Sequence, residues 1–260
     1  MSIIRLVSIG VRDPKRALSV ISHKLFSVVG HNEFRRFIVL SRSRAGSNLL
    51  ISLLNSHPNI HVDREIFGKL NGRNYKKVLQ RAFGKQPFYV KAKGFKIFYY
   101  HPQDDKSCGI WDNLASLDDL YVIHLKRRNI LHTLVSRKIA EITDVWSVRS
   151  DLPSSSFKKE VSVSFTIDEL NQGFKQTKEW EEAGDNAFRN NPLLSIDYEE
   201  LVNHPTAAFF KLNDFLGVQQ LKLQTKLKKQ NTRTLRETVT NYDELKSAFA
   251  ETEWAPFFED

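Results

Sequence analysis

Short apolar runs alternate with longer amphipathic segments along this chain. A short run of β-branched and aromatic residues is typical of a buried strand, and such runs occupy residues 37–40, 88–90, 95–99, 120–125 and 193–198. Helical periodicity covers residues 47–56, 130–139, 168–189 and 207–216, and Gly217 ends the last of these. This alternation predicts an α/β fold: a single domain with a P-loop-like parallel sheet flanked by helices on both faces. In such a sheet, ligands bind at the carboxyl ends of the strands.

The first 33 residues are basic at their start and amphipathic after Pro14. Apolar side chains recur there at helical spacing, at Leu18, Ile21, Leu25 and Val28. We interpret residues 1–33 as an N-terminal extension whose helix packs on the domain formed by residues 34–260. A membrane-surface helix that makes peripheral contact, or a transit-like extension, is the alternative.

Positive charge is concentrated near the start of the chain. The net charge is +9, and residues 1–50 contain nine lysines and arginines against two acidic residues. A positive field in that region suits an anionic ligand. Cys108 is the sole cysteine, which excludes an intrachain disulfide and a Cys-rich metal site and favours a reducing, cytoplasmic compartment. No apolar stretch approaches the ~20 residues of a membrane span.

Residues 41–48 join the first predicted strand to the first predicted helix. A helix N-terminus presents unpaired N–H groups and the positive end of the helix dipole, so this loop is typical of a phosphate site. Its candidate binding residues are Arg42, Arg44, Ala45, Gly46, Ser47 and Asn48. Ser41 and Gly46 have the spacing of the two glycines in a Walker A loop, but Ser47 replaces the lysine that follows. This departure argues against ordinary ATP or GTP hydrolysis.

A second basic cluster follows the predicted strand 120–125. Arg127 and Arg128 stand at the strand end, and Ser136 comes two turns into the next helix. This arrangement suits a second, separate phosphate, and its alternative is a solvated, charged face. Two phosphate sites at neighbouring strand ends suit a nucleotide that is phosphorylated at both its 5′ and 3′ positions.

With these motifs in this order, the sequence resembles the sulfotransferase family, particularly its bacterial and carbohydrate-acting branches. The family's 5′-phosphosulfate loop has a basic residue, a hydroxyl residue, a glycine and two more hydroxyl residues. Residues 44–48 match it, although Ala45 and Asn48 depart from the hydroxyl pattern. The family's 3′-phosphate motif is an arginine followed eight or nine residues later by a serine, which Ser136 matches with either Arg127 or Arg128.

The resemblance implies further residues and a reaction. It places Tyr198 near the adenine and assigns Lys229 and Gln230 to a late basic loop that closes over the 3′-phosphate. It implies transfer of a sulfonate group from 3′-phosphoadenosine 5′-phosphosulfate (PAPS), with adenosine 3′,5′-bisphosphate (PAP) as product. The acceptor is expected to be a hydroxyl of a small molecule, carbohydrate or glycolipid. Neither a metal nor a nucleic-acid partner is expected.

Four residues are candidates for the chemistry itself. Glu65 stands where carbohydrate-type relatives carry a catalytic glutamate, and His101 stands where cytosolic relatives carry a histidine, so either is a candidate general base. Lys96 is a candidate for stabilising the leaving oxygen. Arg44, in the loop, is expected to hold the 5′-phosphate and its developing negative charge.

Two other classes of protein stay open at this stage. One is a P-loop NTP-dependent kinase, which would require magnesium and a strand-end aspartate that the sequence does not clearly supply. The other is a non-enzymatic nucleic-acid- or membrane-binding protein, which the basic first 50 residues favour and which would show strongly salt-dependent binding.

Overall fold

The computed structural model describes residues 30–146, 161–223 and 233–259. At its centre five parallel strands form a sheet in the order β2-β3-β1-β4-β5. The strands are β1 (Arg35–Ser41), β2 (Ile60–Asp63), β3 (Ala92–Phe98), β4 (Leu120–Lys126) and β5 (Leu193–Asp197). The predicted parallel sheet is therefore confirmed, and β1, β3, β4 and β5 fall on predicted runs.

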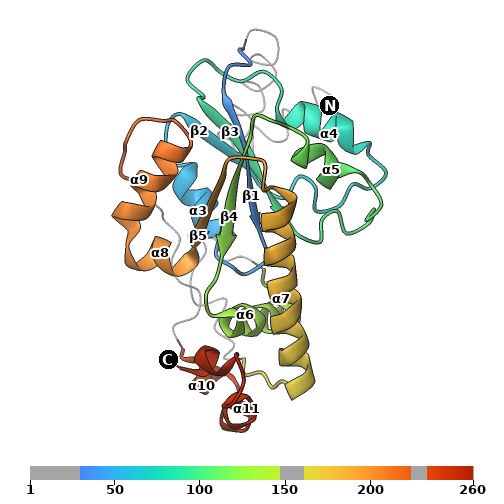
Figure 1. The fold of residues 1–260 in the computed structure, drawn as a ribbon, viewed down its shortest axis with the longest axis vertical. Coiled ribbons are helices and arrows are strands. Elements are labelled where there is room, and N and C mark those ends of the chain that lie inside the picture. Colours follow the sequence, from blue (N-terminus) through green and yellow to red (C-terminus); the bar gives the residue numbers. More distant parts are fainter. Residues whose placement is uncertain (1–29, 147–160, 224–232, 260) are drawn as a thin grey trace, which may run out of the picture.

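Helices cover both faces of the sheet (Figure 1). On one face α3 (Ser47–Leu54), α8 (Tyr198–Asn203) and α9 (Pro205–Phe215) share a buried core with Phe37, Val39 and Ile123. On the other face α4 (Tyr75–Ala82) and α5 (Ile110–Ala115) border a core that includes Ile38, Leu40 and Phe95. Neighbouring residues of a strand point to opposite faces, so the continuous apolar run of β1 supplies both cores. The prediction of helices on both faces is confirmed.

A third group of helices lies beyond the carboxyl ends of the strands, and its longest member runs back along the sheet (Figure 1). It consists of α6 (Ile130–Thr143), α7 (Ile167–Ala187), α10 (Leu235–Thr238), α11 (Tyr242–Phe249) and a 3₁₀ turn, η2 (Ala255–Phe258). Their core centres on Phe174 of α7, whose ring lies 5.3 Å from that of Trp254 and 5.7 Å from that of Phe249. None of the described helices combines the length and the apolarity that a membrane crossing requires.

The structure corrects the sequence prediction around β3. Residues 88–90 are a turn rather than a strand: the Val90 N–H donates to the Pro87 carbonyl, and the Phe88 side chain is 64% exposed. Gly94 lies inside β3. A Cβ there would come within 2.5 Å of the Phe37 carbonyl oxygen, so only glycine allows β1 and β3 to approach this closely.

Several described elements have no counterpart in the sequence prediction: β2, α4, α5, α8, α10, α11 and η2. β2 is short, and its burial alternates between buried and half-buried positions because it is an edge strand of the sheet. α4 begins at the cap residue Asn74, whose side chain accepts from the Lys76 and Lys77 N–H groups. The helix predicted after Pro14 lies outside the described residues.

Candidate functional site

The loop after β1 has an unusual backbone conformation, with two residues at positive φ. Arg44 and Gly46 both have positive φ, 69° and 95°, and Gly46 is the N-cap of α3. A Cβ on Gly46 would lie 2.3 Å from the ring of Tyr198, so the position requires glycine for its space as well as its conformation. No acidic residue stands in the first turn of α3, which leaves the positive end of the helix dipole unneutralised.

The structure separates the two strand-end arginines, Arg127 and Arg128. Arg127 turns toward the loop: its guanidinium carbon lies 4.6 Å from the ring centroid of Tyr198, and it donates to the Arg44 carbonyl at 3.3 Å. Its side chain is 14% exposed, and its Nε lies 4.0 Å from Glu199 Oε1 and has no hydrogen-bond partner among the described residues. Burial lowers its pKa. Arg128 instead points outward, with a 66% exposed side chain that donates to Asp197 at 2.6 Å.

Arg44 joins the loop to α6. Its Nε donates to the Ser136 hydroxyl at 2.9 Å, and its Nη1 donates to the Trp146 carbonyl at 2.6 Å. Burial, and then the neighbouring charge of Arg127, lowers the pKa of Arg44. Two cations held this close together, one in each predicted phosphate motif, form a concentrated positive field that suits an anion.

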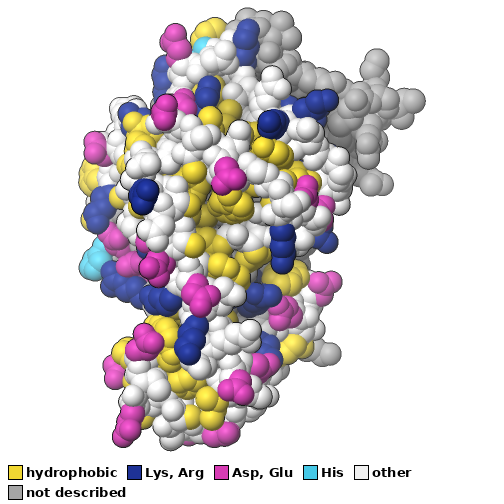
Figure 2. Space-filling view, turned by 45° about the vertical axis from the view of Figure 1, so that its right-hand side comes forward, with side chains coloured by type: hydrophobic (Ala, Val, Ile, Leu, Met, Phe, Trp, Pro, Cys, Tyr) yellow, Lys and Arg dark blue, Asp and Glu magenta, His cyan; other side chains and the backbone are white. Residues whose placement is uncertain are grey.

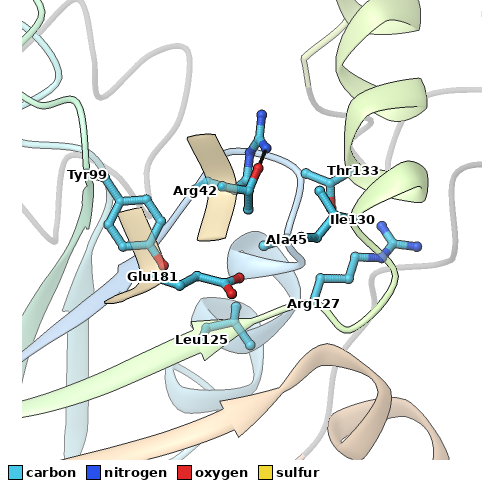
Figure 3. Close-up of a pocket in the computed structure, with 9 residues that line it drawn as sticks. Arg42, Ala45, Tyr99, Leu125, Arg127, Ile130, Thr133 and Glu181 are labelled. Atoms are coloured by element: carbon cyan, nitrogen blue, oxygen red, sulfur yellow. Dashed lines mark hydrogen bonds between the residues drawn. The ribbon is translucent and has the colours of Figure 1, made fainter. Parts of the chain in front are cut away.

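Arg42 takes a different direction from Arg44. It is 4% exposed, donates from Nη1 to the Thr177 hydroxyl of α7 and lies 5.6 Å from the ring centroid of Trp180. Burial, and then the charge of Arg137, lowers its pKa to about 10. Figure 3 shows Arg42 in a narrow crevice among Ala45 of the loop, Tyr99, Leu125, Arg127, Ile130, Thr133 and Glu181. Arg42, which the sequence groups with the ligand-binding residues, therefore fastens the loop to α7.

The catalytic candidates Glu65, Lys96 and His101 lie together on the other side of the loop. Lys96 Nζ is 2.8 Å from Glu65 Oε1 and donates to Asn48 Oδ1 at 2.9 Å. His101 Nε2 is 3.9 Å from Glu65 Oε2. Lys96 is 2% exposed, whereas the Glu65 side chain is 42% exposed. Burial lowers the pKa of Lys96, and the carboxylate of Glu65 opposes that shift.

One hydrogen bond to the His101 ring, together with the burial of the ring, determines which of its nitrogens carries the proton. Its Nδ1 accepts from the Phe98 N–H at 3.2 Å, and burial lowers its pKa to about 4. At neutral pH the ring is therefore uncharged, with its one proton on Nε2 facing Glu65. The lone pair of Nδ1 is already used, so Glu65 is the group of this pair that can accept a proton.

A polar chain around the buried His124, which the sequence analysis did not identify, supports the site. The Tyr99 hydroxyl lies 2.7 Å from His124 Nε2, and His124 Nδ1 lies 2.7 Å from Asp185 Oδ1 on α7. Lys126 Nζ donates to the other oxygen of Asp185 at 2.7 Å. A histidine inside the apolar run of β4 was the available signal, but the sequence could not show which residue it would contact.

The structure thus brings most of the predicted residues together. Around the loop lie Arg44, Ala45, Gly46, Ser47, Asn48, Arg127, Ser136, Tyr198, Glu65, Lys96 and His101. Arg128 points away from them. Lys229 and Gln230 lie outside the described residues.

This chain is similar to several known proteins. The family model described as Stf0 sulphotransferase matches residues 98–244. Nodulation protein H of Rhizobium meliloti is 31% identical over 241 residues, which cover 86% of this chain and 95% of that protein. Nodulation protein H of Rhizobium tropici is 30% identical over 238 residues, covering 86% and 92%. The crystal structure of a sulfotransferase from Alicyclobacillus acidocaldarius gives a TM-score of 0.48 at 16% identity, covering 82% of this chain and 90% of that one.

Proposed function

Since this chain belongs to the Stf0 sulphotransferase family, we propose that it transfers a sulfonate group from PAPS to a hydroxyl of a carbohydrate or glycolipid. The observation that carries this proposal is the position of the Glu65–Lys96 ion pair against Asn48, within the loop that would hold the donor. Acid–base groups and an anion-binding loop therefore share one site.

The residues of the loop suit such a donor. The amides at the start of α3, beside Arg44, would bind the 5′-phosphate end of PAPS. Arg127 and Ser136 would bind the 3′-phosphate, because Arg127 has a buried Nε without a hydrogen-bond partner among the described residues. Tyr198, whose ring lies against Gly46 and the Arg127 guanidinium, would lie near the adenine. Bound there, PAPS supplies an electrophilic sulfur and a phosphate leaving group.

Glu65 would act as the general base. In the transfer, the acceptor oxygen forms a bond to sulfur and gives its proton to Glu65, while the bond from sulfur to the phosphate oxygen breaks and leaves its electron pair on that oxygen. Glu65 becomes neutral as it takes the proton. The positive charge of Lys96 then loses its carboxylate partner and can stabilise the developing negative charge on the phosphate oxygen. His101, with its proton on Nε2, would orient Glu65.

Titration calorimetry with PAP and with 5′-AMP tests the donor site. The chain offers a matched pair of variants, Arg127→Ala and Arg128→Ala, because neighbouring arginines point to opposite sides. Loss of a charge-assisted contact costs about 2 kcal/mol, or about 30-fold in Kd. We expect that loss for PAP with Arg127→Ala, little change with Arg128→Ala, and a far smaller effect of either variant on 5′-AMP. Equal, weak binding of both nucleotides to the intact chain would refute the proposal, and magnesium-dependent binding of ATP would favour a kinase.

A further inference from the structure

Lys93, in the first half of β3, is a buried lysine that the proposed transfer does not use. It is 1% exposed. Because side chains alternate along a strand, it points to the face where Phe95 and Ile97 share an apolar core with α4 and α5. Figure 2 shows lysine and arginine side chains at the surface on this side of the molecule, where water solvates them. Lys93 lies beneath that surface, and a buried cation is costly unless the protein supplies a partner for it.

The partner of Lys93 is the last residue of β2. Lys93 Nζ donates to Asp63 Oδ2 at 2.6 Å, and His61 Nε2 lies 3.3 Å from the other carboxylate oxygen. Burial lowers the pKa of Lys93, and the Asp63 carboxylate opposes that shift. Replacing a buried ion pair by well-packed uncharged side chains is often neutral or stabilising, so stability alone does not account for this pair.

This ion pair holds the start of the segment that carries Glu65. Glu65 follows Asp63 by two residues, and its side chain is 42% exposed. On the other side of Glu65, Phe67 is fully buried, with its ring centroid 5.2 Å from that of Phe95. Between the two anchors, the Gly68 N–H donates to the Glu65 carbonyl at 3.2 Å and closes a turn. Glu65 is therefore the exposed middle of a segment that is anchored on both sides.

Both anchors contact β3, the strand that also carries Lys96. Lys93 and Phe95 point to one face of the sheet. Lys96 points to the other face, where its Nζ lies 2.8 Å from Glu65 Oε1. The register of the two strands pairs Asp63 with Phe95. One strand thus holds the segment of the general base on one face and presents the cation that meets the base on the other.

We propose that Lys93 and Asp63 are positioning residues, whose ion pair fixes the end of β2 so that Glu65 is held in place for proton transfer beside Lys96. The pair acts through the backbone of residues 63–65, not by contact with a substrate. A displacement of about 1 Å can cost about 100-fold in rate, so a slight loosening of this segment is enough to slow the transfer. This inference rests on the proposed function, because it requires Glu65 to be the general base.

Removing both charges together tests this role without leaving one of them buried and unpaired. The variant is Lys93→Met with Asp63→Asn, made both in the intact chain and in the Glu65→Gln background. The matched control is Lys211→Met with Glu200→Gln, which removes an ion pair between α9 and α8. Urea unfolding and titration with PAP report on the fold and on the donor site.

Initial rates of transfer from sulfur-labelled PAPS report on catalysis. The acceptor probes are glucose, N-acetylglucosamine, their β-1,4-linked tetramers and octyl glucoside, and the probe that the intact chain modifies fastest is used throughout. We expect Lys93→Met with Asp63→Asn to lower kcat about tenfold. KM for PAPS and PAP affinity should change less than about twofold. The urea midpoint should stay the same or rise, and the control should behave like the intact chain.

The Glu65→Gln background separates positioning from a general structural role. With no base left to position, the same two substitutions should lower kcat less than about twofold there. An equal tenfold loss in both backgrounds, or an unchanged kcat in the intact background, would overturn the proposal. A fall in the urea midpoint or in PAP affinity would show that the pair maintains the fold, and would overturn it as well. Failure of the intact chain to bind PAP would instead refute the proposed function itself.

Discussion

The substitution Glu65→Gln tests the assignment of the general base most directly. Glutamine keeps the shape of the side chain and an oxygen that can accept from Lys96, now 2.8 Å from Glu65 Oε1, but it cannot take a proton. General-base catalysis contributes about 10²–10⁴ in rate, which corresponds to about 3–5 kcal/mol of activation free energy. His101 cannot replace the lost base, because its Nδ1 already accepts from Phe98. We therefore expect kcat to fall by about 10²–10⁴ with PAP affinity little changed.

A confounding effect must be separated from this loss. Glu65→Gln also removes the charged partner of Lys96, which is 2% exposed, and a buried charge left without its partner is costly. The same substitution in a Lys96→Met background separates the two roles, because no lysine is then left without its partner. If Glu65 is the base, the double variant should still be about 100-fold slower than Lys96→Met alone.

Initial rates of labelled sulfonate transfer at saturating PAPS provide the assay, with the carbohydrate that the intact chain modifies fastest as acceptor. His101→Asn is the comparison: as a positioning residue it should lower kcat about tenfold or less. A kcat for Glu65→Gln within tenfold of the intact chain, or a larger loss in His101→Asn than in Glu65→Gln, would refute the reasoning.

Two further predictions concern stability and the loop. Burial lowers the pKa of His101 and of His124 to about 4, against ~6.5 when unfolded, so the unfolded chain binds more protons between these values. Stability should therefore fall as pH falls from about 6.5 to 4, by up to about 3 kcal/mol for each histidine. Urea unfolding followed across this range should show a shallower dependence in His124→Gln, and an equally steep one would contradict the assignment. Gly46→Ala should lower PAP affinity and Tm, because its Cβ would lie 2.3 Å from Tyr198. Gly72→Ala is the control, because it also places an alanine at positive φ, 72°, but in open space. Calorimetry should show normal PAP binding by this variant.

Those features of the fold that depend on residues close together in the sequence could be predicted from the sequence. The β-branched run of β1, the small residues of the loop and the periodicity of α3 each act locally, so the strand–loop–helix unit was predictable. β2 was not, because His61 and Asp63 interrupt its apolar pattern. The run 88–90 looked like a strand by composition, but Pro87 and the turn that Val90 closes end the extended backbone there.

The same distinction between local and long-range information applies to the candidate site. The sequence could find the basic residues at two strand ends, but the direction of a side chain depends on where the strand stops and the next turn begins. Arg127 and Arg128 are adjacent and chemically identical, and only their packing against Tyr198 and Asp197 distinguishes them. Glu65, Lys96 and His101 could be proposed one by one. Their association across β2 and β3 required the structure, because β2 could not be predicted and its pairing with β3 was therefore unknown.

The polar chain from Tyr99 through His124 to Asp185 explains why α7, far along the sequence, matters to a loop near its start. A pKa of about 4 keeps His124 neutral at pH 7, so its Nδ1–H donates to Asp185 and its Nε2 accepts from the Tyr99 hydroxyl. Each polar group in the chain then has a partner, and a satisfied buried network favours one arrangement of its members over others. Arg42 makes the second connection, from the loop to Thr177 and Trp180. Because α7 is fastened both to the donor loop and to the strand ends, the donor loop is held in one geometry against the sheet, which in-line transfer between two substrates requires.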